Sequence, residues 1–233
     1  MPPDASVDGH RIDALLRLVS WVTAGALALT LLAFALALLS KRRTLSTATG
    51  SVAGVLALVL VIELLIGLRA RRDLDHRWSA PRGPDVVRVE VLARRFSWQF
   101  RLAGDDDLFG TPDDVVTLDD VTLPAGRPVV MALRSRDVVH GLYIPQLRAR
   151  SDAIPGRTTH LWFTAARPAE VEAACSSLCG PAHYQMRAAL HLVSPADFTA
   201  RTHALSVEQR RRREAATDAG AREDDLAWPW TPP

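Results

Sequence analysis

The amino-acid sequence predicts a membrane-anchored all-β protein, in which an N-terminal transmembrane hairpin of two helices precedes a Greek-key β-sandwich. Long apolar runs occur only in the first third of the 233-residue chain. Beyond them, short stretches of alternating apolar and polar residues are separated by glycine and proline, a pattern typical of a sandwich. The net charge of +2 gives no reason to expect nucleic-acid binding, and two cysteines are too few for a disulfide framework.

The first apolar run extends over residues 18–40 and contains 23 residues without a charge. At about 1.5 Å of rise per residue, a helix of this length crosses a hydrocarbon core of about 30 Å. The run is too long for a removed signal peptide and has no small-residue cleavage site. A second membrane helix is predicted at about residues 48–68, with an uncharged stretch that begins at Thr44. A hairpin of this kind places both ends of the chain on the same side of the membrane.

Charge alone does not settle the orientation of the hairpin. The basic residues 41–43 would keep the connecting loop in the cytoplasm, but arginines also follow the second helix. Glu63 lies in the last third of the second helix, where an ionisable residue is a functional candidate. We favour the alternative that Glu63 pairs with a neighbouring helix or with Arg69.

The soluble part is expected to form one β domain at residues 86–198, joined to the hairpin of residues 1–72 by a polar linker at 73–85. The strand-like stretches are 87–92, 96–102, 115–118, 128–134, 138–144, 158–164 and 187–193. The charged tail at 199–233 is predicted to be a short amphiphilic helix or disordered. It lacks the Cys-x-x-Cys-His motif, so no haem c domain is expected in it.

The segment from Cys175 to Met186 concentrates residues that bind soft metal ions. Within twelve residues it holds both cysteines of the chain, Cys175 and Cys179, together with His183 and Met186. Thiolate, imidazole and thioether ligands together favour copper, whereas zinc has little use for a thioether. A short disulfide or two buried thiols are the alternative, but neither would require the histidine and the methionine at close spacing. We therefore interpret the segment as a copper-binding loop.

The loop resembles the Cys-x3-Cys-x3-His-x2-Met segment of subunit II of cytochrome c oxidase, which holds the dinuclear copper centre called CuA. That family also has an Asp-Val-x-His segment, matched here by Asp137–His140, and an Asp-Ala-x-Pro-Gly segment, matched by Asp152–Gly156. The three motifs occur in the family's order, and the resemblance covers roughly residues 10–200. It implies a cupredoxin-like β-sandwich behind the hairpin, with the copper domain on the outer face of the membrane.

The resemblance also implies the ligands of two copper ions. His140 and His183 would each bind one ion, Cys175 and Cys179 would bridge both, and Met186 would be the weak axial ligand of one of them. The remaining histidines in the β domain, His160 and His191, have no cysteine or methionine at ligand spacing. They are expected to be surface or core histidines.

Ser177 is the clearest departure from the family inside the loop. Its main-chain carbonyl would be the axial ligand of the second copper ion. The family usually has glutamate at this position, whose carboxylate reaches a magnesium ion at the junction with the catalytic subunit. Serine supplies no carboxylate, so we expect the magnesium site to be absent, weakened or rebuilt from partner residues.

Three aromatic residues alternate in one predicted strand: Phe96, Trp98 and Phe100. The resemblance implies that a similar cluster, usually richer in tryptophan, receives the electron from cytochrome c, with Phe96 and Trp98 in the two tryptophan positions. The alternative is that the three rings pack on one face of the strand. Both interpretations can hold together.

Seven aspartates and no basic residue lie between Arg101 and Arg127: Asp105, Asp106, Asp107, Asp113, Asp114, Asp119 and Asp120. A solvated or cation-binding loop is one interpretation. The slightly favoured one is an acidic patch that attracts a basic cytochrome c, with donor docking at Asp113, Asp114, Asp119 and Asp120.

These observations predict the electron-accepting subunit of a membrane terminal oxidase. It would take electrons from cytochrome c or a similar donor and pass them to a haem-copper catalytic subunit, subunit I, that reduces oxygen to water. The chain itself would perform only electron transfer. The alternatives are a CuA subunit of another respiratory complex, of the nitric oxide reductase type, or a tethered copper carrier that works alone. The expected location is the plasma membrane of a bacterium, crossed more than once, with the copper domain outside.

Overall fold

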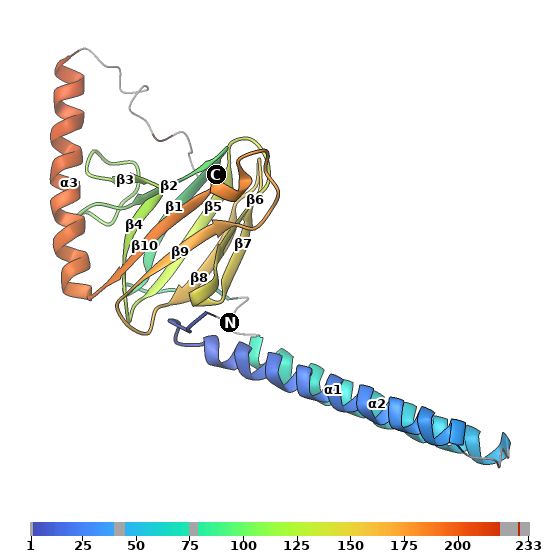
Figure 1. Ribbon diagram of the computed structural model, residues 1–233. Coiled ribbons are helices and arrows are strands. Elements are labelled where there is room, and N and C mark those ends of the chain that lie inside the picture. Colours follow the sequence, from blue (N-terminus) through green and yellow to red (C-terminus); the bar gives the residue numbers. More distant parts are fainter. Residues whose placement is uncertain (1, 40–44, 75–78, 220–227, 229–233) are drawn as a thin grey trace. The chain divides into compact units, whose positions relative to one another are not determined.

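The computed structural model describes residues 2–39, 45–74, 79–219 and 228 (Figure 1). The chain divides into two compact units, residues 10–79 and residues 1–9 together with 80–233. The first contains two helices and the second contains two β-sheets and a third helix.

The N-terminal unit contains helix α1 (Gly9–Leu39) and helix α2 (Leu45–Leu74). Residues 9–35 of α1 are long and apolar enough to cross a membrane, and among the described residues no second stretch passes the same test. The expected loop at 41–43 and the side chains at the start of α2 lie outside the described residues. The structure therefore confirms one apolar helix and does not confirm the second span of the predicted hairpin.

The β domain is a sandwich of two five-stranded sheets, ordered β3-β2-β1-β5-β8 and β4-β10-β9-β6-β7. The strands of the first sheet are β1 (Val87–Arg94), β2 (Ser97–Leu102), β3 (Val115–Leu118), β5 (Pro128–Ser135) and β8 (Thr159–Thr164). Those of the second sheet are β4 (Asp120–Pro124), β6 (His140–Ile144), β7 (Ala149–Ala153), β9 (Ala169–Cys175) and β10 (Arg187–Val193). The predicted sandwich is confirmed. Its sheets are mixed, because β1 runs parallel to β5 and β4 parallel to β10.

Alternating side chains build the core between the sheets. Val129, Met131 and Leu133 of β5 point inward and are fully buried, while the residues between them are only partly buried. Trp98 and Phe100 of β2 are fully buried in the same core. The period of two that predicted these strands is thus the period at which their side chains enter the core.

Three strands were not predicted: β4, β7 and β9. In β9 buried and more exposed residues alternate, but the buried ones have small side chains: Val171, Ala173 and Cys175. The apolar pattern of this strand is therefore weak. β7 lies at the edge of its sheet and carries the polar run Arg150–Asp152. β4 has only five residues, begins with Asp120 and ends with Pro124. Strand pairing rather than composition defines these three strands.

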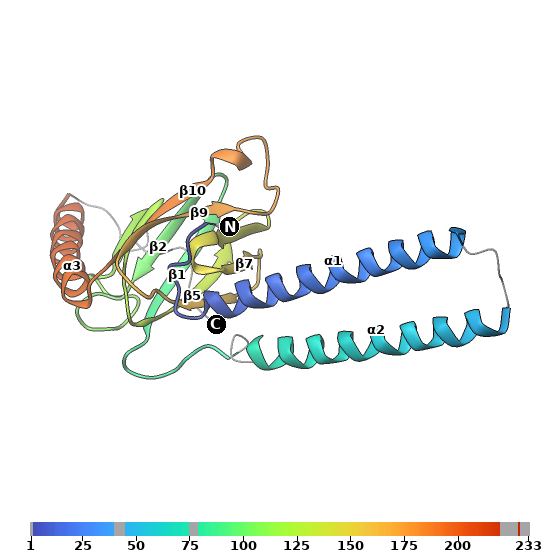
Figure 2. The same cartoon turned by 60° about the horizontal axis from the view of Figure 1, so that its bottom comes forward.

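The segment before α1 packs against the β domain, as Figure 2 shows in dark blue. The amide of Ala5 donates to the carbonyl of Gln146 (2.8 Å), and the amide of Val7 donates to that of Thr164 (2.9 Å). The Ala5 carbonyl in turn accepts from the amide of Ala166 (2.8 Å), and Ala5 is buried in the core. The residues that directly precede α1 are therefore part of the β domain.

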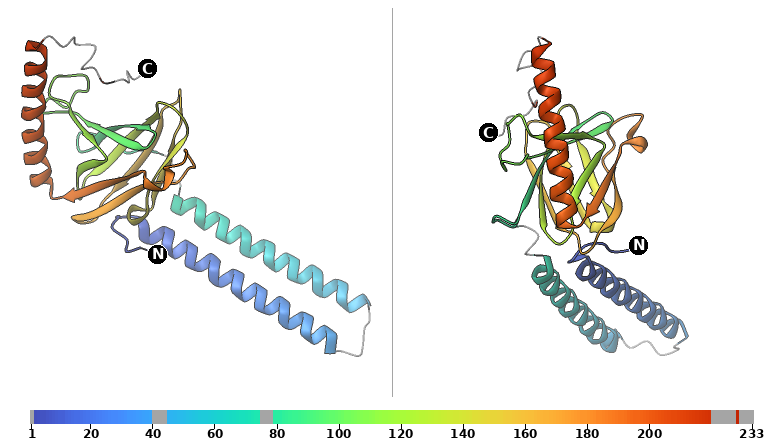
Figure 3. Two further views of the ribbon diagram at one scale, coloured as in Figure 1. Left: turned by 45° about the horizontal axis from the view of Figure 1, so that its top comes forward. Right: turned by 90° about the vertical axis from the view of Figure 1, so that its left-hand side faces the viewer.

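The predicted tail forms helix α3 (Pro195–Asp218), which lies beside β3 and β4 (Figures 1 and 3). Ser194 begins the helix as its N-cap, accepting a hydrogen bond from the amide of Asp197, and Pro195 follows at the first helical position. On the side of the helix that faces the domain, His203 and Ser206 both bond to Asp105 in the aspartate-rich loop. The tail is thus helical over this range.

Candidate metal centre

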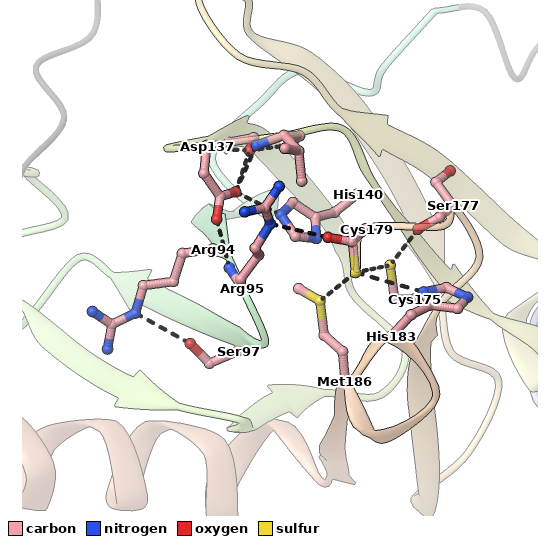
Figure 4. A network of polar contacts seen from close by, with 12 residues as sticks. Arg94, Arg95, Ser97, Asp137, His140, Cys175, Ser177, Cys179, His183 and Met186 are labelled. Carbon is pink, nitrogen blue, oxygen red and sulfur yellow. Dashed lines mark hydrogen bonds and ion pairs between the residues drawn. The ribbon is translucent and has the colours of Figure 1, made fainter. Parts of the chain in front are cut away.

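Five side chains with metal-binding atoms meet at one end of the sandwich (Figure 4). His140 begins β6, Cys175 ends β9 and Cys179 lies in the loop that follows. His183 begins the 3-10 helix η3 (His183–Gln185), and Met186 ends it immediately before β10. The pairing of Leu142 with Cys175 brings β6 beside β9. A hydrogen bond from the Cys175 amide to the Met186 carbonyl (3.0 Å) closes the loop.

The coordinating atoms of these residues lie within a few ångströms of one another. The Cys175 and Cys179 sulfur atoms are 3.9 Å apart, and the Cys179 sulfur is 3.6 Å from His183 Nδ1 and 3.9 Å from the Met186 sulfur. His140, Cys175 and Cys179 form a group whose ligand atoms all lie within 4.8 Å. Both cysteines are free thiols, so the disulfide interpretation is not supported. The structure brings the whole predicted ligand set together.

Asp137 holds the His140 ring in an orientation that leaves its second nitrogen available to a metal ion. Its Nε2 lies 2.8 Å from Asp137 Oδ1, and its Nδ1 is buried without a hydrogen-bond partner. A buried unpaired nitrogen is costly unless a ligand occupies it, and a carboxylate that holds the other ring nitrogen is the usual support of a metal-bound histidine. The donor set therefore fits a soft metal ion. Although burial acts in the opposite direction, bonds from His140 and from the Arg95 and Val138 amides lower the pKa of Asp137 to about 2.

The Cys179 thiol is shielded from water. Burial and the neighbouring Cys175 raise its pKa to about 11, and a metal ion that binds here would replace the proton. The Cys179 carbonyl accepts a hydrogen bond from Arg95 Nε (3.0 Å). Arg95 was not predicted as a site residue, because it is separated from Cys179 by 84 positions and no local motif marks it.

Ser177 occupies a polar cluster beside the thiols. Its carbonyl oxygen, the predicted axial ligand, is 3.2 Å from the Cys175 sulfur. Its hydroxyl donates to Asp152 Oδ1 (3.1 Å), and Asp152 also accepts from the guanidinium of Arg150 (2.9 Å). Arg150 donates from Nε to Ser176 Oγ as well (2.9 Å). A guanidinium group therefore stands close to the Ser177 side chain.

The aromatic residues lie at different depths. Trp98 is fully buried, and its ring meets that of His140 edge-on with the centroids 6.0 Å apart. Phe96 is partly buried; a Cβ added at Gly180 would lie 3.1 Å from its ring, so the ring covers the backbone just after Cys179. Phe100 belongs to the core. Phe96 is thus the ring of the three that connects the surface with the metal loop.

The predicted docking aspartates need correction at two positions. Asp113 and Asp114 are 5% and 7% exposed, so they do not face a docking partner. Asp114 pairs with the buried Arg101 (2.8 Å) and Asp113 with Arg210 of α3 (3.6 Å). Their carboxylates are paired with arginines of the same domain and are shielded from water.

The other two predicted docking aspartates are closer to the surface but also have partners. Asp119 is partly buried and accepts a hydrogen bond from the Trp98 amide (2.6 Å). Asp120 is exposed and pairs with His191 (2.7 Å), which also approaches Glu170. His160 is exposed on β8. Neither of these histidines lies in the metal-binding group of the described residues.

Known proteins are similar to the domain that holds this site. Residues 102–193 match the family model of the cytochrome c oxidase subunit II periplasmic domain. The alternative cytochrome c oxidase subunit 2 of Bradyrhizobium diazoefficiens is 36% identical over 138 residues, which cover 50% of this chain and 50% of that protein. Cytochrome c oxidase subunit 2 of Alkalihalophilus pseudofirmus is 27% identical over 166 residues, covering 71% and 46%. The chain thus spans about half the length of the curated relatives it matches.

Among solved structures, the periplasmic domain of cytochrome oxidase subunit II from Bradyrhizobium japonicum is 19% identical, with a TM-score of 0.49. The similarity covers 56% of this chain and 99% of that one. The motifs, the family match and the curated relatives agree. Together they show that the domain that holds the cysteine loop is similar to the periplasmic domain of cytochrome c oxidase subunit II.

Proposed function

We propose that the chain is the electron-accepting subunit of a membrane terminal oxidase and that it binds a dinuclear copper centre. The observation that carries the proposal is the buried pair of thiols 3.9 Å apart, with an unpaired histidine nitrogen, a second histidine and a thioether around it. Sulfur and imidazole ligands of this kind suit copper. A single cysteine would suffice for a mononuclear copper site, so the second thiol supports a bridged pair of ions.

Each ligand has a position that suits its proposed role. Cys175 and Cys179 would bridge the two ions, with His140 on one ion and His183 on the other. Met186 and the Ser177 carbonyl would be weak axial ligands, which the contacts of the Met186 sulfur with Cys179 and of the Ser177 oxygen with Cys175 support. When bound, the copper pair supplies a one-electron carrier. The chain's own part is to hold these atoms in a rigid, water-poor site between paired strands, where little rearrangement opposes a change of charge.

In this proposal the Ser177 side chain does not bind a magnesium ion. Arg150 already brings a positive charge to Asp152 and to the serines of the loop. A divalent cation at the same place would meet that charge and would find no carboxylate from position 177.

We further propose that α1 and α2 cross the plasma membrane as a hairpin, with the copper domain on the outer face. The residues before α1 pack in the β domain, and the linker after α2 leads directly into β1. The two segments that connect the hairpin with the β domain would then both lie at the outer face of the membrane. The proposed partners are a haem-copper catalytic subunit in the membrane and a soluble electron carrier, such as a cytochrome c, outside it.

Copper counting and electron paramagnetic resonance on the full-length protein test the copper centre. Elemental analysis should give two copper ions per chain, and the unpaired spin should couple to two copper nuclei. Cys179→Ser should convert the centre to a mononuclear one or abolish copper binding, while Ser176→Ala, next to Cys175 but outside the ligand set, should keep both ions. One copper per chain and a one-nucleus spectrum in the wild type would refute the dinuclear centre. Copurification with a haem-bearing membrane subunit tests the oxidase assignment separately.

A further inference from the structure

The surface next to the metal loop carries three arginines. Arg94 and Arg95 lie at the end of β1 and in the turn to β2, and Arg136 follows β5. The Arg136 amide donates to the Ala93 carbonyl (2.9 Å), so Arg136 lies directly beside that turn. All three side chains are exposed. We call Arg94, Arg95 and Arg136 the arginine patch.

The positive charge of the arginine patch is not neutralised within the described part of the chain. No ion pair joins any of the three guanidinium groups to a carboxylate there. Arg94 donates to the Ser97 hydroxyl (3.2 Å) and Arg95 to the Cys179 carbonyl (3.0 Å), both of which are uncharged acceptors (Figure 4). These bonds fix the side chains and leave their charge unpaired.

The nearby carboxylate of Asp137 does not cancel the arginine patch. Its side chain is 30% exposed and accepts from His140 and from the amides of Arg95 and Val138. One carboxylate against three guanidinium groups leaves the arginine patch with a net positive charge.

The arginine patch surrounds the route from the surface to the metal loop. Phe96 directly follows Arg95, and its ring lies over Gly180, the residue after Cys179. A carrier that donates at Phe96 must therefore rest on the arginine patch. The buried aspartates 113 and 114, by contrast, are already paired with arginines and offer such a carrier nothing.

We infer that the arginine patch docks an electron carrier whose contact surface is acidic. The inference rests on the proposed function, since it takes the metal loop as the electron acceptor. It reverses the sign expected from the aspartate-rich sequence. Opposite charges across such a contact accelerate association and orient the partners, and salt weakens both effects.

The test measures binding of two soluble cytochromes c, one acidic and one basic, to the copper-loaded full-length protein. The protein is placed in nanodiscs made of lipids that carry no net charge. Dissociation constants are measured by calorimetry at low and at high salt. The acidic cytochrome should bind more tightly than the basic one, and its affinity should fall as salt is raised. Arg94→Gln combined with Arg136→Gln should weaken this binding about tenfold at low salt, because two charges of the patch are lost.

Two control variants separate charge from structure. Arg94→Lys keeps the charge and should keep most of the affinity. Arg88→Gln removes an exposed arginine from the same strand, six residues or about 20 Å from Arg94, and should leave binding unchanged. Tighter binding of the basic cytochrome, or an unchanged constant in the double variant, would overturn the inference. Copper content and spin coupling are measured on the same samples. Loss of the dinuclear signal with patch-dependent binding intact would therefore refute the proposed copper centre and leave the docking inference standing.

Discussion

Arg95 joins two parts of the candidate metal centre that are distant in sequence. Its amide donates to Asp137, which orients His140, and its side chain donates to the Cys179 carbonyl. A single residue of the β1–β2 turn thus restrains both the upstream histidine and the cysteine loop. Residues that support metal ligands in this way affect metal binding without touching the metal.

Arg95→Gln should therefore weaken copper retention, by roughly tenfold in the rate of copper loss to a chelator. Arg94→Gln is the matched control, because Arg94 is an exposed neighbour whose bond goes to Ser97 and not to the metal loop. The release of copper is followed by its absorbance after a chelator is added to the loaded protein. Equal release rates in the two variants would show that the bond to Cys179 does not hold the loop.

At this scale, the ligand set could be predicted from the sequence and its supports could not. Cys175, Cys179, His183 and Met186 lie in one short loop, where spacing alone shows the chemistry. Arg95 is 84 positions from Cys179, and Arg150 is 26 positions from Ser176. Such partners become visible only when strand pairing brings them together. The same holds for Asp113 and Asp114, whose burial and pairing with distant arginines no acidic run could indicate.

Among the elements, β1, β2 and the aspartate-rich loop share a buried charge network. Arg101 of β2 lies between Glu90 of β1 (3.3 Å) and Asp114 (2.8 Å), and all three residues are buried. Burial raises the pKa of both carboxyl groups, although Arg101 opposes the shift. The network ties the loop to the outer side of the first sheet, at a cost in desolvation.

The raised pKa values predict how stability depends on pH. Above the ordinary values of 4.5 for Glu90 and 3.8 for Asp114, and up to their raised values, the folded state binds protons that the unfolded state has released. The free energy of unfolding should therefore fall as the pH rises through this window. Glu90→Gln should reduce that slope, whereas Glu172→Gln, at an exposed position, should not. Denaturant titrations at several pH values from about 4 to 7 measure the slope; an unchanged slope in Glu90→Gln would contradict the assignment.

Helix α3 depends on its first turn as well as on its contacts with the aspartate-rich loop. Ser194→Ala removes the N-cap and should cost about 1 kcal/mol of helix stability. Trypsin should then cut the arginine run at residues 210–213 faster, because the helix opens more often. Thr199→Ala is the control, since its hydroxyl bonds only to the carbonyl of Pro195 in the same helix. Equal cutting rates in both variants would mean that contacts with the domain alone hold α3.

For the whole molecule, the sequence predicts the two-part organisation better than the course of the chain within each part. Apolar length distinguishes α1, and alternation distinguishes strands such as β5, because both patterns follow directly from burial. Parallel pairing of β1 with β5 has no such signature, since it depends on which strands meet. The packing of Ala5 in the β domain could not be predicted either, because a seven-residue segment has too little pattern to show a partner.

Epitope accessibility in intact cells tests the proposed hairpin. Epitopes inserted before residue 2 and at Gly83 in the linker should be reached by antibody once the outer layers are opened. An epitope at residue 42 should be reached only after the plasma membrane is permeabilised. If the N-terminal epitope is also protected until then, the chain crosses the membrane once and the hairpin is wrong.

The N-terminal segment also sets the order in which this protein can mature. The Pro2 carbonyl accepts a hydrogen bond from Arg148 across 146 positions, so the segment before α1 finds its partner only in a part of the chain that leaves the ribosome much later. In the proposed topology these two partners reach the outer face by separate crossings, one ahead of α1 and the other after α2. The domain is completed only when both have been exported. The β domain and its copper loop would then fold completely only in molecules whose helices have inserted correctly into the membrane.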